Sequence, residues 1–176
     1  MKNSVFYRIK VLLSLIKEFV FLIVLSTIFF LIMNIWGHLE FPNLWVTVLV
    51  FFSITKIYLL VSHTFKKLDK LIKDNHSFKH MLFLLGAIIT LIITSFTIDY
   101  LCVSEIYKDA FYGIEYSQPV VSRFADLLYF SIVTFTTVGY GDITPINPVA
   151  KLITVFEMMS AFVVIVFVIS KYFRNK

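Results

Sequence analysis

The chain has 176 residues, of which 59% are hydrophobic and only 15% are charged. Soluble domains carry roughly a quarter charged residues, so this composition excludes an ordinary soluble protein and indicates a membrane protein. The single cysteine, Cys102, excludes an internal disulfide and a cysteine-based zinc site. The net charge of +5 comes from basic residues that flank apolar runs, which indicates a membrane surface rather than nucleic acid as partner.

Four apolar segments are long enough to cross a bilayer as helices, since a span needs about 20 residues. They cover residues 19–36, 44–62, 81–103 and 151–172. A fifth apolar run, residues 124–135, is too short to cross and is typical of a re-entrant segment. We expect Ser122 to cap the first turn of this short helix and Asp126 to lie near the positive end of its dipole.

Charged residues are rare inside the predicted spans. Lys56 lies two thirds along the second span, close enough to one membrane surface for its side chain to snorkel there. A voltage sensor needs several Arg or Lys residues at three-residue spacing. The first three spans contain no such series, so the sequence does not predict voltage sensing through this device.

Lys and Arg residues are distributed unequally between the two sides of the predicted spans. Most of the 16 fall at the N-terminus, in the loop of residues 62–80 and in the C-terminal tail. The other side carries mainly acidic residues, among which we count Asp99. The positive-inside rule therefore predicts that both termini and the middle loop lie in the cytoplasm. We expect a multi-pass protein of the plasma membrane.

The middle loop has an amphipathic pattern. Its apolar residues Phe65, Leu68, Leu71 and Ile72 share one helical face. Its basic residues, which lie largely elsewhere, are Lys66, Lys67, Lys70 and Lys73. This pattern predicts either an interfacial helix that contacts anionic lipids or a solvated linker.

Residues 136–142, with the sequence Thr-Thr-Val-Gly-Tyr-Gly-Asp, are the most informative part of the chain. Two of its five glycines fall here, separated only by Tyr140. This segment resembles the selectivity filter of potassium channels, in which four copies of a Thr-Val-Gly-Tyr-Gly loop turn backbone carbonyls toward one axis. The resemblance extends over residues 122–172 and is that of a prokaryotic-type channel with two additional N-terminal spans.

The resemblance implies an all-α membrane protein with four transmembrane helices, a re-entrant pore helix and a selectivity-filter loop, assembled as a homotetramer. It divides the chain into a cytoplasmic or interfacial N-terminus (1–18), a two-span hairpin (19–62), a cytoplasmic basic linker (63–80), the pore domain (81–172) and a cytoplasmic tail (173–176).

The resemblance also implies the ion sites. It assigns K⁺ to the backbone carbonyls of Thr137, Val138, Gly139 and Tyr140 and the Thr137 hydroxyl, with Gly141 completing the filter. Gly139 and Gly141 allow backbone angles that a residue with a Cβ resists, so successive carbonyls can face inward. Val138 and Tyr140 are expected to point away from the axis and brace the ring. K⁺ is the permeant ligand, and no cofactor is predicted.

Further residues are predicted to support the filter or to gate the pore. Thr136 precedes the filter, and Asp142 follows it and can attract cations or brace the loop. In some relatives a glutamate on the pore helix pairs with this aspartate, and the matching position here is Val133. Glu157 lies inside the fourth span, where Ser131 or Thr134 can satisfy it behind the filter; direct ion contact is the alternative. The candidate inner gate is one helical face formed by Phe162, Ile165 and Ile169, for which ordinary packing is the alternative.

Other functions compete with a potassium-selective channel subunit. A non-conducting regulatory subunit of another potassium channel is the main alternative, and a subunit of an active potassium transporter is a second. A membrane-embedded enzyme is not predicted, because no paired acids or activated nucleophile are apparent.

Overall fold

The computed structural model describes residues 17, 20, 21, 23–33, 35, 42–59 and 78–174, with side chains described up to residue 59 and from 85 to 166. The labelled elements are α2 (Pro42–Leu59), α4 (Phe78–Ile106), β1 (Phe111–Tyr112), α5 (Val120–Phe135), β2 (Thr144–Pro145) and α6 (Pro148–Arg174). The described part is therefore mostly helical, as predicted.

Three helices among the described residues are long and apolar enough to cross a membrane. They are Pro42–Leu59, the Leu85–Ile106 part of α4 and the Pro148–Val166 part of α6. A shorter apolar helix covers Ile23–Met33. The predicted first span, 19–36, lies partly outside the described residues, as do the N-terminus, the basic linker and the end of the tail, so a fourth span stays a prediction.

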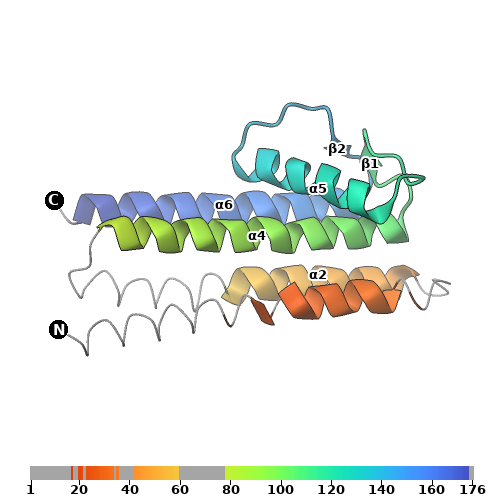
Figure 1. The fold of residues 1–176 in the computed structure, drawn as a ribbon, viewed down its shortest axis with the longest axis horizontal. Coiled ribbons are helices and arrows are strands. Elements are labelled where there is room, and N and C mark those ends of the chain that lie inside the picture. Colours follow the sequence, from red (N-terminus) through yellow and green to blue (C-terminus); the bar gives the residue numbers. More distant parts are fainter. Residues whose placement is uncertain are drawn as a thin grey trace.

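The helices lie roughly along one direction in stacked layers (Figure 1). α4 and α6 lie side by side and form the middle layer, α5 packs on one face of it, and α2 packs on the other. α2 contacts both α4 and α6. After α5 the chain turns back and runs alongside that helix to β2 before α6 begins. This is the course of a re-entrant segment, which enters and leaves on the same side.

Two helix starts follow directly from local sequence. Asn147 caps α6, since its side-chain oxygen accepts a hydrogen bond from the Val149 amide at 2.8 Å, and Pro148 occupies the first helical position, where its missing N–H does no harm. α5 begins earlier than predicted, with Pro119 as its N-cap and no side-chain capping bond. The predicted Ser122 cap is therefore wrong.

Asp126 does not lie in the first turn of α5 either, because that turn begins at Val120 and contains no acidic residue. Its predicted interaction with the helix dipole is wrong for the same reason, since the dipole acts mainly within the first turn.

Three threonine hydroxyls of α4 bond to their own helix. The Thr90, Thr94 and Thr97 hydroxyls each donate to the carbonyl four residues earlier, at 2.8–2.9 Å. Such bonds satisfy a polar group where water is absent, so these residues are compatible with the hydrocarbon region.

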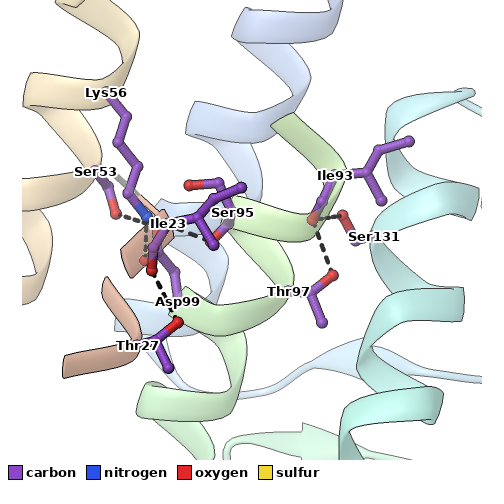
Figure 2. A network of polar contacts seen from close by, with 9 residues as sticks. All are labelled: Ile23, Thr27, Ser53, Lys56, Ile93, Ser95, Thr97, Asp99 and Ser131. Carbon is purple, nitrogen blue, oxygen red and sulfur yellow. Dashed lines mark hydrogen bonds and ion pairs between the residues drawn. The ribbon is translucent and has the colours of Figure 1, made fainter. Parts of the chain in front are cut away.

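Lys56 does not snorkel to the membrane surface, and this prediction is wrong. Its ammonium lies 2.6 Å from a carboxylate oxygen of Asp99 on α4, and both side chains are buried (Figure 2). Asp99 accordingly belongs inside the Leu85–Ile106 span rather than among the acidic residues of a loop. A close partner of opposite charge is what makes a lysine tolerable at this depth.

An aromatic cluster joins α4, β1 and α5. The Tyr100 ring packs edge-on against Phe111 and Phe130, with ring centroids 5.6 and 5.1 Å apart, and Phe111 and Phe130 also contact each other. All three rings are buried. The cluster holds α5 against α4 and so fixes the base from which the residues after α5 extend.

Candidate functional site

The loop that follows α5 has an alternating backbone conformation. Thr137, Gly139 and Gly141 have φ angles of 59°, 57° and 81°, and Thr137 is the one described non-glycine residue with a positive φ. Left-handed residues at every second position make successive peptide units turn in opposite senses, which lets their carbonyls share one side of the loop. Glycine adopts this conformation at little cost, so the geometry favours glycine at positions 139 and 141, whereas Thr137 adopts it in spite of its Cβ.

The end of α5 continues into the loop through backbone hydrogen bonds. Thr136 forms the C-cap, and its hydroxyl donates to the Ile132 carbonyl at 2.7 Å. The Val138 amide donates to the Val133 carbonyl at 3.0 Å. The start of the loop is thus fixed to the last turn of the helix, whose C-terminal end carries the negative pole of the dipole.

The predicted ion-site residues lie together in this one loop, and their side chains are exposed in the single chain. Val138 is 52% exposed and Tyr140 is 71% exposed. Within the single chain these two side chains therefore do not pack into the core, and the predicted bracing by them requires neighbouring copies.

Asp142 at the far end of the loop is held by Tyr129 of α5. The Tyr129 hydroxyl donates to one carboxylate oxygen at 2.7 Å, and the Ile143 amide donates to the other at 3.0 Å. These hydrogen bonds, the Tyr129 bond first, lower the pKa of the Asp142 carboxyl below its usual value. Val133, the position that matches the glutamate of some relatives, is buried and cannot pair with Asp142, and the sequence does not indicate Tyr129, one helical turn earlier.

Residues after Asp142 are joined to the segment after α4. β1 and β2 pair antiparallel, with Tyr112 opposite Thr144, and the Ile146 amide donates to the Ala110 carbonyl at 2.9 Å. Gly113 has a φ of 84°, and a Cβ at this position would collide with the Asp142 backbone carbonyl. Gly113 therefore permits a close approach that places the outer end of the loop.

Glu157 lies on α6 behind the loop and is fully buried. Its carboxyl accepts hydrogen bonds from the Ser131 hydroxyl of α5 and the Tyr100 hydroxyl of α4, each at 2.5 Å. Of the two predicted partners, Ser131 makes the contact, whereas no bond to Thr134 is present within the described helices. No pattern in the sequence indicates Tyr100, which is distant along the chain from Glu157. The arrangement joins three helices at one carboxyl group.

A second ion pair fixes the start of α5. Arg123 donates to Glu105 at 2.5 Å, and both side chains are largely buried. The guanidinium also lies 4.5 Å from the centroid of the Tyr116 ring, a favourable cation–π distance. The two ends of α5 are therefore held by different contacts, Arg123 at the start and Ser131 near the end.

The candidate gate residues are only partly placed. Phe162 is 67% exposed and Ile165 is 45% exposed, and both lie on the unburied face of α6, whereas Ala161 and Val164 lie on the buried face. Ile169 belongs to α6, but its side chain is outside the described ones. The helix thus leaves an apolar face uncovered in the single chain.

Comparison with known proteins identifies the family. An ion channel family model matches residues 86–175, slightly more than half of the chain. The matched region includes most of α4, all of α5 and the loop, and α6. The chain belongs to this ion channel family, and the resemblance to the potassium channel pore family is confirmed. It is a channel-family chain rather than an enzyme.

Curated relatives agree with the family. The chain is 38% identical over 77 residues to two-pore potassium channel 4 of Arabidopsis thaliana, covering 44% of this chain and 24% of that protein. It is 46% identical over 42 residues to a hyperpolarization-activated voltage-gated potassium channel of Methanocaldococcus jannaschii, covering 24% of this chain and 20% of that protein.

A voltage-gated potassium channel of Aeropyrum pernix is 35% identical over 71 residues, which cover 38% of this chain and 24% of that protein. The chain therefore matches a quarter or less of the length of each of these relatives. No solved structure gives a significant match.

We predict that Tyr129→Phe raises the pKa of Asp142. The Tyr129 hydrogen bond lowers the pKa of the Asp142 carboxyl in the folded protein. The wild-type carboxylate therefore stays ionised until the pH falls below the ordinary carboxyl range of about 4. Without the hydroxyl, the carboxylate should protonate at a higher pH. An NMR titration of the Asp142 carboxyl carbon measures this shift.

Tyr112→Phe is the matched control for that titration, since Tyr112 is an exposed tyrosine near the same loop. It should leave the Asp142 titration unchanged. Identical titration curves for Tyr129→Phe and the wild type would contradict the hydrogen bond.

We also predict that Gly113→Ala destabilises the protein. A left-handed backbone costs an L-residue about 1–2 kcal/mol, and the added Cβ also displaces the Asp142 carbonyl. Thermal unfolding of the purified protein should show a lowered midpoint. Gly86→Ala is the control, because nothing lies within 4 Å of a Cβ there and the helical position favours alanine. Equal midpoints for the two variants would refute the close approach at Gly113.

Proposed function

We propose that this chain is a subunit of a potassium-selective channel that conducts K⁺ passively through a pore formed by four copies. In this proposal the carbonyls of Thr137, Val138, Gly139 and Tyr140, with the Thr137 hydroxyl, replace the hydration shell of the ion. The observation that carries the proposal is the alternating backbone of residues 137–141 at the end of a re-entrant helix. The names of the relatives, which are potassium channels, agree with it.

Four copies are proposed because one loop cannot surround an ion. A dehydrated cation in a bilayer needs several oxygen ligands at each site, and one chain supplies one carbonyl per level. The single chain also leaves apolar residues uncovered near the loop and along α6. They are Ile132, Val138, Tyr140, Leu152, Val155, Met158, Met159, Phe162, Ile165 and Val166. Contact with neighbouring copies would cover part of this surface, and the remainder would line the pore.

The rest of the architecture follows from this assembly. α4 is the outer helix of the pore, α5 the pore helix and α6 the inner helix. A two-span hairpin, consisting of a first span near residues 19–36 and α2, packs outside the pore, consistent with the position of α2 on the side of α4 and α6 opposite α5. The proposed location is the plasma membrane, with both termini in the cytoplasm. Contact of Lys66, Lys67, Lys70 and Lys73 with anionic lipids is a further proposal about residues outside the described ones.

Rubidium uptake into liposomes that contain only this chain tests the proposed function. We expect rubidium uptake. Potassium should compete with rubidium, sodium should not, and barium should block the uptake. Empty liposomes are the control. Folded tetramers that take up no rubidium would favour the alternative, a non-conducting regulatory subunit. A monomeric or dimeric protein in a native-like bilayer would contradict the proposed assembly.

Tyr140→Asp tests the selectivity part of the proposal. Loss of the Tyr140 ring removes the bracing expected between neighbouring copies, so sodium should compete with rubidium at least about tenfold more strongly, or about 1.4 kcal/mol. The control is Tyr112→Phe, outside the loop. Full potassium preference in a conducting Tyr140→Asp channel would show that Tyr140 does not set selectivity.

Ile165→Asn tests the proposed gate. A polar ring in place of an apolar one favours water in the inner pore, so rubidium uptake should rise several-fold over the wild type. Ile165→Val keeps the ring apolar and should behave like the wild type. Equal uptake by the asparagine and valine variants would remove Ile165 from the gate.

A further inference from the structure

A set of buried polar side chains, made of two halves that meet at adjacent residues of α4, crosses four helices. It begins on α2, crosses α4, and ends where α6 meets α5. Its members are Ser53, Lys56, Asp99, Tyr100, Glu157 and Ser131, and we call this set the polar relay. Three of the six, Lys56, Asp99 and Glu157, are of types that are charged at neutral pH in water, and such residues in a membrane span are usually functional.

The first half of the polar relay joins α2 to α4. The Lys56 ammonium lies 2.6 Å from one carboxylate oxygen of Asp99, and the Ser53 hydroxyl donates to the other oxygen at 2.8 Å. Lys56 also donates to the Ser95 carbonyl at 3.3 Å. Figure 2 shows Lys56 and Ser53 of α2 converging on the same turn of α4. α2 is therefore held to α4 by bonds that fix the rotation of α4 about its own axis.

The second half begins at the next residue of α4. Tyr100 donates to Glu157 of α6, and Glu157 accepts from Ser131 of α5. Ser131 also lies 3.1 Å from the Ile93 carbonyl of α4 (Figure 2). Consecutive helical residues point about 100° apart, so Asp99 faces α2 while Tyr100 faces α6 and α5. A rotation of α4 that breaks one half necessarily displaces the other.

We propose that Lys56 and Asp99 are positioning residues for the ion-binding loop. By fixing α4, they keep Tyr100 and Glu157 against Ser131, which lies on the last turns of α5 just before the loop. The hairpin thereby tunes the conformation of the loop rather than only covering the pore. This inference rests on the proposed function for its physiological meaning, but its structural part can be tested without conduction.

Amide hydrogen exchange of residues 136–142 in the purified, assembled protein is the test. The first variant is Lys56→Met with Asp99→Asn, which removes both charges and so avoids an unpaired buried charge. We expect exchange in the loop to be several-fold faster than in the wild type. Tyr100→Phe, which cuts the second half, should have a similar effect. Thr55→Ala is the matched control on α2, because its hydroxyl bonds only to the Phe51 carbonyl of its own helix.

The triple variant decides whether the two halves act in series. If Lys56 and Asp99 act through Tyr100, adding their substitutions to Tyr100→Phe should not accelerate loop exchange further. If the triple variant instead accelerates loop exchange by the product of the factors measured for the double variant and for Tyr100→Phe, the proposed coupling through the polar relay is wrong. Unchanged loop exchange in the Lys56→Met, Asp99→Asn variant would also overturn it. Exchanging the charges, Lys56→Asp with Asp99→Lys, should return loop exchange toward the wild-type rate.

Two additions keep the test decisive. If the Lys56→Met, Asp99→Asn variant does not fold, Ser53→Ala replaces it, because this change removes one hydrogen bond to Asp99 and leaves the ion pair. Ser53→Ala should accelerate amide exchange in the loop by a smaller factor. Unchanged exchange in this variant would count against the inference. Rubidium uptake is measured in parallel. A wild type that does not conduct contradicts the proposed function, whereas the exchange rates test the positioning role independently.

Discussion

The proposed ion-binding loop must meet one constraint, the high free energy of a dehydrated cation in a low-dielectric membrane. Oxygen atoms must replace water at fixed positions, and a backbone that relaxed around the ion would lose the advantage. The loop of residues 137–141 has the alternating φ angles that such a site needs. Three sets of contacts hold this loop in place. The end of α5 fixes Val138, Tyr129 holds Asp142, and the pairing of β1 with β2 fixes the residues that follow the loop.

The same low dielectric explains how the charged residues inside the helices are arranged. Lys56 and Asp99 form a close ion pair, and the Glu157 carboxyl accepts hydrogen bonds from two hydroxyls. Each of these three buried groups therefore has a polar partner. Each arrangement joins helices that are distant along the chain. Buried polar groups therefore specify how α2, α4, α5 and α6 pack, in a region where the apolar surfaces are similar to lipid and give little specificity.

The sequence predicted the features that depend on local pattern. The three helices that are long and apolar enough to cross a membrane follow from runs of apolar residues, and the shorter helix α5 follows from a run too short to cross. Features that depend on tertiary contact were missed. The pairing of Lys56 with Asp99 joins residues 43 positions apart, and the Tyr100 and Tyr129 hydrogen bonds depend on helix packing. The start of α5 was misplaced because Pro119, without a side-chain cap, replaces the expected serine signal.

The central claim is that four copies of one loop arrange backbone oxygens around a row of cations. The most direct measurement is anomalous diffraction from crystals of the protein in lipid with rubidium or thallium. We expect a row of anomalous peaks on a fourfold axis, level with the carbonyls of residues 137–140. Carbonyls of that loop facing away from the axis, or an assembly without fourfold symmetry, would contradict it.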